Sequence, residues 1–212
     1  EGARVALTAR DAGLLRRVCL ALPGKGHAVI PADLASPGQV ARLAGQTKAW
    51  CGGALDILVN NASVLGPLRP CVEIRAEEFA AVLQVNLIAV FDLTTRLIPL
   101  LESSRHAVIL NVTSSAGRVG RASWGPYSAS KFGIESLTQT WAEELAPRGI
   151  RTVAINPGGT RTRMRAEAHP EEDPKSVPPP EEVANAFLAA AIQQSLKSGS
   201  SFDARDPGWQ TA

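Results

Sequence analysis

The stretch Leu55-Asp56-Ile57-Leu58-Val59 is a nearly continuous run of apolar residues that follows Gly52-Gly53 and precedes Asn60-Asn61. A strand that is covered on both faces has this composition. Ala107 to Val112 is a second run of the same kind, and Ile150 to Ile155 has the pattern of a further strand. Buried strands of this kind are typical of a parallel sheet with a layer of helices on each face.

Helical patterns alternate with these strands along the chain. Asp11 and Ser36-Pro37 mark helix starts, because a side-chain oxygen before the first turn and a proline within it both favour a helix. The predicted helices run from Asp11 to about Leu22, Ser36 to Gly52, Ala76 to Leu101, Tyr127 to Ala146 and Pro180 to about Ser195, and the other strands are Arg4 to Ala9, His27 to Ala32 and Ser201 to Asp203. The segment from Met164 to Pro180 is predicted to be a long loop or lid. The alternation predicts a single α/β domain over residues 1–212 with a doubly wound parallel sheet.

Composition and charge exclude several classes of partner. The 212 residues include 22 basic and 20 acidic side chains, and no basic stripe carries interleaved aromatic residues, so we expect no nucleic-acid partner. No apolar run reaches the roughly 18 residues of a membrane helix, so we expect no membrane partner. The three cysteines show no ligand spacing and indicate reduced thiols in a cytoplasmic protein, and the three scattered histidines indicate no metal site.

Polar residues follow several of the predicted strands. Arg10, Asp33, Asn60-Asn61-Ala62, Ser114 and Pro157-Gly158 each come at or just after a strand end. In an open parallel sheet, ligands bind outside the carboxyl ends of the strands. The sequence therefore predicts a binding site at this edge.

Tyr127-Ser128-Ala129-Ser130-Lys131 opens a predicted helix and places a phenol and an ammonium four residues apart. Residues at this spacing lie on one face of a helix. A neighbouring cation lowers the pKa of a phenol from its usual value of about 10, which would make Tyr127 a proton donor or acceptor at working pH. The alternative is a helix-face pair without a chemical role, since this spacing is common.

Asn86 is a polar amide within the apolar stripe of the helix predicted from Ala76 to Leu101. A buried amide needs hydrogen-bond partners, because leaving it unpaired costs a few kcal/mol. Asn86 is therefore either a site residue or a helix-distorting amide with only backbone partners. Ser114 has a similar alternative, as a loop hydroxyl between Thr113 and Ser115.

In their order along the chain, these residues resemble the motifs of the short-chain dehydrogenase/reductase family in its single-domain form. The motifs are Asn60-Asn61-Ala62, Asn86, Ser114, Tyr127-x-x-x-Lys131 and Asn156-Pro157-Gly158, and Ser114 lies thirteen residues before Tyr127, with Gly117 between them. The stretches from Gly120 to Gly125 and from Asn156 to Thr162 look like a bacterial branch known only as generic oxidoreductases.

The resemblance implies a role for each catalytic residue. Tyr127 would give a proton to a carbonyl oxygen as hydride arrives from a nicotinamide, and Ser114 would hydrogen-bond that oxygen. Lys131 would lower the pKa of Tyr127 and hold the ribose hydroxyls. Asn86 would anchor a water molecule that links Lys131 to solvent.

The resemblance also implies the cofactor contacts. Relatives that prefer NAD place an acid at the end of the strand that here ends in Ala9-Arg10, whereas an arginine pairs with a 2′-phosphate. Arg10 therefore favours NADP over NAD; the alternative is an ordinary surface arginine. Further contacts would come from Asp33 and Leu34 at the adenine, Asn60 and Ala62 along the adenosine ribose, Pro157 and Gly158 after the strand, and Thr160 and Thr162 at the nicotinamide carboxamide.

Two departures from the family pattern affect the expectations. Ser63 stands where the family has a glycine. A strand, a glycine-rich turn and a first helix, roughly 30 residues by the size of such motifs, would precede Gly2 in this family. We therefore expect the chain to be an amino-terminally truncated piece that neither folds stably nor binds NADP when expressed alone. The strand at Val5 is expected either to stand apart from the strand at Leu55 or to pair with it directly.

The predicted function is hydride transfer between NADP(H) and a small carbonyl or alcohol substrate. The family resemblance also implies a homodimer or homotetramer, packed through the helices that contain Asn86 and Lys131. Two alternatives stay open: a non-catalytic remnant or oligomerisation scaffold, and a sugar-nucleotide epimerase or dehydratase, which shares the Tyr-x-x-x-Lys pair. Four apolar residues either line the substrate pocket or belong to ordinary packing: Leu65, Val119, Trp124 and Met164. Arg161, Arg163 and Arg165 attract an acidic substrate or belong to a solvated loop.

Overall fold

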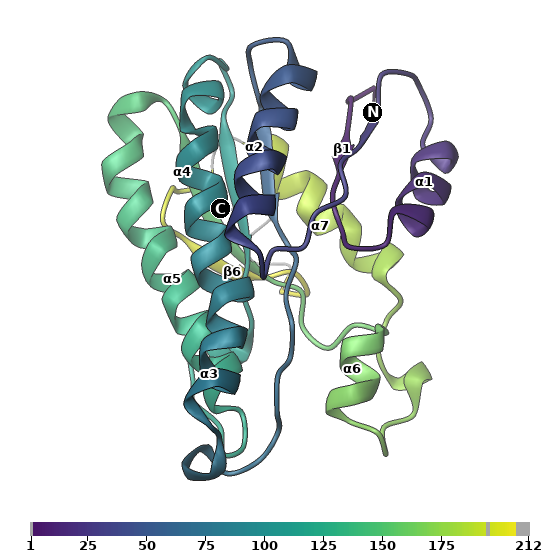
Figure 1. Ribbon diagram of the computed structural model, residues 1–212, viewed down its shortest axis with the longest axis vertical. Coiled ribbons are helices and arrows are strands. Elements are labelled where there is room, and N and C mark those ends of the chain that lie inside the picture. Colours follow the sequence, from purple (N-terminus) through teal and green to yellow (C-terminus); the bar gives the residue numbers. More distant parts are fainter. Residues whose placement is uncertain (1, 194–195, 207–212) are drawn as a thin grey trace.

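The computed structural model describes residues 2–193 and 196–206. Its parallel strands alternate with helices, as the apolar pattern predicts (Figure 1). The strands are β1 (Ala6–Leu7), β2 (Ala28–Val29), β3 (Ile57–Asn60), β4 (Val108–Val112), β5 (Arg151–Asn156) and β6 (Ser201–Asp203). The α-helices are α1 (Ala12–Ala21), α2 (Pro37–Cys51), α3 (Ala76–Leu83), α4 (Ala89–Glu102), α5 (Gly125–Leu145), α6 (Arg163–Ala168) and α7 (Pro180–Ile192). The predicted α/β class is confirmed.

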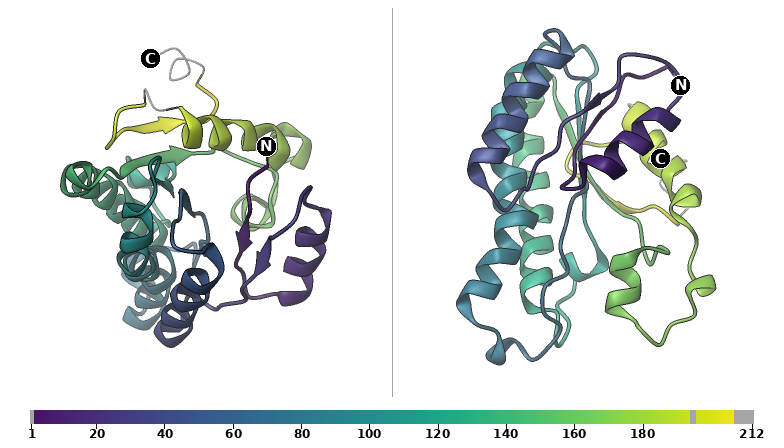
Figure 2. Two further views of the ribbon diagram at one scale, coloured as in Figure 1. Left: turned by 90° about the horizontal axis from the view of Figure 1, so that it is seen from above. Right: turned by 45° about the vertical axis from the view of Figure 1, so that its right-hand side comes forward.

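The larger sheet has the order β3-β4-β5-β6, with all neighbours parallel. The alternating side chains of β4 face two different cores. Ile109 packs in the cluster formed with α2, α4 and α5, while Val108 and Leu110 pack in a second cluster with α7. Helices therefore cover both faces of this sheet (Figure 2, left), which explains why β4 is apolar throughout.

The smaller sheet consists of β1 and β2 alone. Hydrogen bonds from the backbone of Ile30 to Leu7 (2.9 Å) and of Ala32 to Ala9 (3.1 Å) continue the pairing beyond the two short strands. β1 does not pair with β3 within the part of the chain that the structure describes. Of the two arrangements expected for the strand at Val5, the separated one is confirmed and direct pairing with the strand at Leu55 is wrong.

The long helix predicted from Ala76 to Leu101 is interrupted by a π-helical turn, η2 (Gln84–Ile88), between α3 and α4. The span Ala76–Glu102 is long and apolar enough to cross a membrane by length and composition. This corrects the expectation that no apolar stretch reaches that length. Leu97 and Leu101 in its second half are almost completely buried within the cluster that α4 shares with α2 and α5, as in a core helix.

The segment predicted to be a loop from Met164 to Pro180 contains two short helices, α6 and the 3₁₀-helix η5 (Pro174–Ser176). The Thr162 hydroxyl accepts a hydrogen bond from the backbone N–H of Arg165 at 3.2 Å and caps α6. Arg165 then donates two hydrogen bonds to Glu172, at 2.7 and 2.6 Å. Because the cap and this double contact hold the first part of the segment, part of the predicted loop becomes helical.

Candidate active site

A cavity of about 720 Å³ lies at the carboxyl ends of β3, β4 and β5, beneath α6 and α7. This is the edge at which ligands bind open parallel sheets. The predicted site residues that line the cavity are Ala62, Ser114, Tyr127, Lys131, Pro157, Gly158, Thr160 and Thr162. The predicted site residues outside its lining are Arg10, Asp33, Leu34, Asn60 and Asn86.

Tyr127 lies in the first turn of α5 and is buried, with Trp124 packed edge-on at 5.7 Å between ring centroids. Burial raises the pKa of the phenol, and a hydrogen bond with the Ser114 side chain opposes this shift. The sequence prediction that the pKa of Tyr127 is lowered is therefore wrong for the protein without cofactor. Spacing along a helix reveals a neighbouring cation, but it does not reveal how much solvent the fold removes.

Lys131 lies one turn further along α5 and is 3% exposed. Its Nζ donates a hydrogen bond to the backbone carbonyl of Val112 at 2.8 Å and lies 5.6 Å from the centroid of the Tyr127 ring. Burial lowers the pKa of Lys131 to about 8. The side chain is therefore still mainly an ammonium at neutral pH, at the base of the cavity.

Ser114 lies just after the end of β4 and caps the 3₁₀-helix η3 (Ser115–Gly117). Its hydroxyl accepts a hydrogen bond from the N–H of Ala116 at 3.2 Å. Gly117 lets this loop lie directly against α5. A Cβ at this position would come within 2.9 Å of the Lys131 backbone carbonyl and of the Thr113 hydroxyl, so a larger residue would push the loop away. The glycine thus keeps Ser114 close to Tyr127.

Asn86 sits in the π-helical turn and is 1% exposed. Its amide exchanges hydrogen bonds with the backbone of Val64, accepting at 2.8 Å and donating at 2.9 Å, and also donates to the Ser130 hydroxyl at 3.1 Å. The alternative of an amide with only backbone partners is therefore wrong. Asn86 ties the loop after β3 to α5, and its proposed link to Lys131 through water stays a prediction.

Asn60 is buried in β3 and faces the protein interior. Its amide donates to the Thr94 hydroxyl at 3.1 Å and to the side-chain carbonyl of Asn111 in β4 at 2.9 Å. Asn61, the next residue, lines the cavity instead. Successive residues of a strand point to opposite faces, so the pair Asn60-Asn61 cannot place both side chains at a ligand. The Asn60 side chain thus joins β3 to β4, and the place of Asn60 along the adenosine ribose stays a prediction.

Three predicted site residues lie on the segments that follow the strands of the smaller sheet: Arg10 after β1, and Asp33 and Leu34 after β2. Arg10 is exposed, the Asp33 carboxylate accepts a hydrogen bond from the N–H of Ala35 at 3.0 Å, and Leu34 packs against the core cluster. Their cofactor roles stay predictions.

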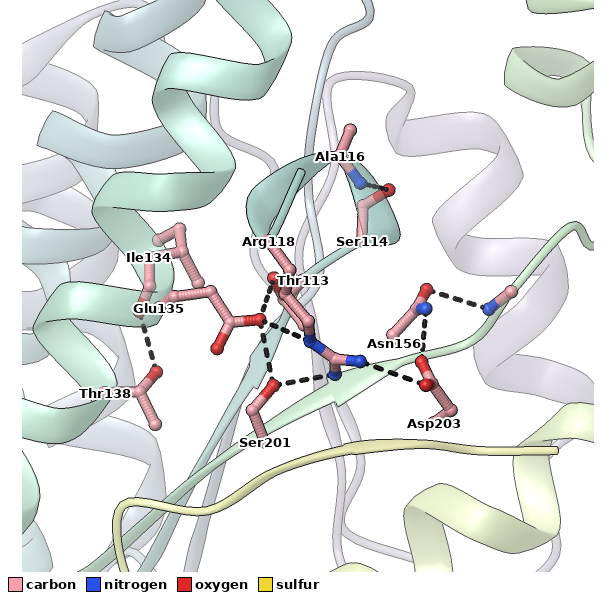
Figure 3. A network of polar contacts seen from close by, with 11 residues as sticks. Thr113, Ser114, Ala116, Arg118, Ile134, Glu135, Thr138, Asn156, Ser201 and Asp203 are labelled. Carbon is pink, nitrogen blue, oxygen red and sulfur yellow. Dashed lines mark hydrogen bonds and ion pairs between the residues drawn. The ribbon is translucent and has the colours of Figure 1, made fainter. Parts of the chain in front are cut away.

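A polar network that the sequence analysis missed lies beside Ser114 (Figure 3). Glu135 on α5 is buried, and its Oε1 accepts hydrogen bonds from Thr113 at 2.8 Å, Ser201 at 2.9 Å and Arg118 at 3.4 Å. A signal was available in the sequence. Tyr127, Lys131 and Glu135 follow one another at intervals of four, so extending the same helix face by one turn reaches Glu135.

Comparison with known proteins agrees with this geometry. The family model for short chain dehydrogenase matches residues 1–173. The uncharacterized oxidoreductase YciK of Escherichia coli K12 is 43% identical over 158 residues, which cover 73% of this chain and 62% of YciK. The chain thus matches less than two thirds of the length of this relative.

Solved structures extend the comparison over nearly all of the chain. A short chain dehydrogenase from Shigella flexneri 2a, complexed with NADP, has a TM-score of 0.90 and 36% identity, covering 97% of this chain and 87% of that one. One from Escherichia coli CFT073, complexed with NADPH, has a TM-score of 0.89 and 37% identity, again covering 97% and 87%. The ordered motifs, the parallel sheet and these matches together show that the chain belongs to the short-chain dehydrogenase family.

Proposed function

We propose that the protein is an oxidoreductase that transfers hydride between NADP(H) and a small carbonyl or alcohol substrate. The observation that carries this proposal is that Ser114, Tyr127 and Lys131 line the same cavity, with the Lys131 Nζ 5.6 Å from the centroid of the Tyr127 ring. A hydroxyl pair at the mouth of an apolar pocket is suited to bind a carbonyl oxygen. Leu65, Ala116 and Trp124 supply the apolar surface around it.

The proton in this scheme comes from Tyr127. A phenol whose pKa is raised by burial stays protonated at neutral pH, and in that form it donates a proton to a carbonyl oxygen. Ser114 donates a hydrogen bond to the same oxygen and helps to hold the charge that develops on it. Lys131, as an ammonium 5.6 Å from the ring, favours the phenolate that remains after the transfer.

The described residues fit the nicotinamide half of a dinucleotide. The Lys131 ammonium has three N–H donors, and the one that bonds to Val112 leaves others to reach ribose hydroxyls. Ser63 lines the cavity with a buried hydroxyl that has no partner among the described residues. The lining also includes residues that would hold the carboxamide: Pro157, Gly158, Thr160 and Thr162. Bound NADPH supplies the hydride.

The preference for NADP rests on Arg10. It is exposed at the end of the extended segment that contains β1, and its guanidinium can form two parallel hydrogen bonds to a 2′-phosphate. The bound NADP and NADPH in two structural relatives support the same choice. Asp33 and Leu34 would contact the adenine beside it.

A homodimer or homotetramer and a cytoplasmic location complete the proposal. Ile88, Phe91 and Phe132 are apolar, lie on or beside α4 and α5, and are 49%, 49% and 44% exposed. A second subunit packed on these helices would cover them, and light scattering that shows a monomer at micromolar concentration would contradict the assembly. Cys19, Cys51 and Cys71 are free thiols, which supports a reducing compartment.

The function is tested by following NADPH consumption by the complete protein with a panel of aliphatic, alicyclic and aromatic aldehydes and ketones. We expect turnover with at least one of these classes. Binding of NADPH without turnover of any panel member would favour the non-catalytic scaffold, and absence of NADPH binding would contradict the proposal altogether.

A further inference from the structure

We propose that Arg118 is a positioning residue that ties the Ser114 loop to the turn after β5 and thereby sets the spacing between the substrate carbonyl and the nicotinamide. This role rests on the proposed function, because it concerns the geometry of hydride transfer. Arg118 does not line the cavity. It acts through the residues that do.

The guanidinium of Arg118 contacts three residues on two elements, α5 and β6 (Figure 3). Nη1 donates to the Asp203 carboxylate at 3.0 Å, Nη2 to the Ser201 hydroxyl at 2.8 Å, and Nε to Glu135 on α5 at 3.4 Å. Arg118 itself ends η3, the short helix that Ser114 caps. One side chain therefore joins the Ser114 loop, α5 and β6.

The connection continues to the cavity wall. The other oxygen of the Asp203 carboxylate accepts a hydrogen bond from the Asn156 side-chain amide, whose carbonyl accepts one from the N–H of Gly158 at 3.0 Å. Pro157 and Gly158 line the same cavity as Ser114 and Tyr127. The path from Arg118 through Asp203 and Asn156 thus links two walls of this cavity, the Ser114 loop and the turn after β5.

A second set of contacts joins the Ser114 loop to α5. Thr113, the neighbour of Ser114, donates from its hydroxyl to Glu135 at 2.8 Å, and Gly117 lies against the backbone of Lys131. Glu135 shares one face of α5 with Tyr127 and Lys131. The proton donor and the turn after β5 are therefore fixed relative to the same carboxylate and guanidinium.

The expected effect is larger on function than on folding. The Arg118 side chain is 33% exposed and that of Asp203 is 46% exposed, and an ion pair this accessible contributes little to stability. The buried Glu135 also loses Arg118, but it keeps the hydrogen bonds from Thr113 and Ser201. By contrast, a displacement of about 1 Å between reacting groups can cost on the order of 100-fold in rate. Loss of Arg118 should therefore misplace the two walls while leaving the fold intact.

The test compares two ligands in the complete protein carrying Arg118→Met: NADPH, and 2′-phospho-ADP-ribose, which lacks the nicotinamide ring. We expect the Kd for NADPH to rise about tenfold and kcat to fall about tenfold. The Kd for 2′-phospho-ADP-ribose should stay unchanged, because that ligand does not reach the tethered turn. Arg118→Lys keeps the charge but cannot bond to Glu135, Ser201 and Asp203 at once. Its changes in kcat and in the Kd for NADPH should therefore lie between those of Arg118→Met and the unaltered protein.

The matched control is Arg148→Met. Arg148 also joins two elements through an ion pair, with Glu102, and its side chain is 43% exposed, but it lies at the far end of the sheet from the cavity. This variant should match the unaltered protein for both ligands.

Two binding results would overturn the role of Arg118: an equal rise in the Kd of both ligands in the two Arg118 variants, or no rise in the Kd for NADPH in either variant. A lower Tm of Arg118→Lys that by itself accounts for its weaker NADPH binding would also overturn it. The comparison needs cofactor binding but no turnover. An unaltered protein that binds NADPH without reducing any carbonyl therefore contradicts the proposed reaction alone, whereas one that binds no NADPH contradicts both.

Discussion

β4 buries all five of its residues between two layers of helices, whereas β1 and β2 contribute two residues each and bury none of them fully. The larger sheet carries the residues proposed for chemistry, and the smaller one carries those proposed to select the cofactor. Proton transfer depends on positions held to fractions of an ångström, while an arginine on an exposed segment can adjust to a phosphate. The two sheets thus differ in how fully their strands are buried.

Replacement of Tyr127 by phenylalanine should have the largest effect, since it removes only the hydroxyl of a residue fixed by the larger sheet. We expect kcat to fall by a factor on the order of 10² to 10⁴, because positioned proton transfer contributes about that much. The Kd for NADPH should change little. Steady-state kinetics and cofactor titration of the complete protein measure the two quantities, and retained turnover would remove Tyr127 from the mechanism.

Matched leucine-to-alanine changes compare the two sheets directly. Leu110 in β4 is 1% exposed, so Leu110→Ala should lower the free energy of unfolding by about 2–5 kcal/mol. Leu7 in β1 is only half-buried, and Leu7→Ala should cost about 1 kcal/mol or less. Urea unfolding of both variants checks this, and equal losses would show that the smaller sheet is as well secured as the larger one.

Arg10→Asp should alter cofactor choice without removing the chemistry. A hydrogen bond to a charged group contributes about 1.5–3 kcal/mol, so the ratio of kcat/KM for NADPH to that for NADH should fall by roughly 10- to 100-fold. Arg17→Asp on α1 introduces the same charge at another exposed position and serves as the control. The prediction fails if the unaltered protein already prefers NADH, or if both variants change the ratio equally.

The smallest expected effect concerns the dependence of stability on pH. In the folded protein without cofactor, burial lowers the pKa of Lys131 from 10.5 to about 8. Between these values the unfolded chain binds a proton that the folded chain has lost, so the free energy of unfolding should rise with pH, by at most about 1.4 kcal/mol per unit. The cost of burying the Lys131 ammonium therefore destabilises the folded protein fully below pH 8 and disappears as the pH rises above that value.

The rise should be measured by urea unfolding between pH 8 and pH 10, because above the usual pKa of Tyr127 its raised value acts in the opposite direction. Lys131→Met should abolish this rise. Lys25→Met, which removes an exposed lysine near the smaller sheet, should leave it intact. A flat profile in the unaltered protein would show that Lys131 is better solvated than its burial indicates.

The sequence predicted the strands of the larger sheet and the residues of its cavity because both depend on local pattern. Apolar runs identify β3, β4 and β5, and the ends of those strands gather Ser114 and Pro157-Gly158. The expectation that β3 is covered on both faces is wrong, because Ile57 and Val59 are 37% and 45% exposed. Other features depend on contacts between distant segments. Asn60 turns toward Thr94 and Asn111, and the pKa of Tyr127 follows from burial, so neither could be found from spacing alone.

The π-helical turn from Gln84 to Ile88 joins α3 to α4, so the number of residues in this turn sets how the two helices are rotated relative to each other. One residue in an α-helix corresponds to a rotation of about 100°. Deleting any single residue from this turn would rotate one half of the helix against the other. Either Asn86 would turn away from Val64 and Ser130, or Leu97 would turn out of the core. At positions of this turn other than Asn86, substitutions are therefore better tolerated than a deletion, and natural or designed variants should keep its length even where they change its sequence.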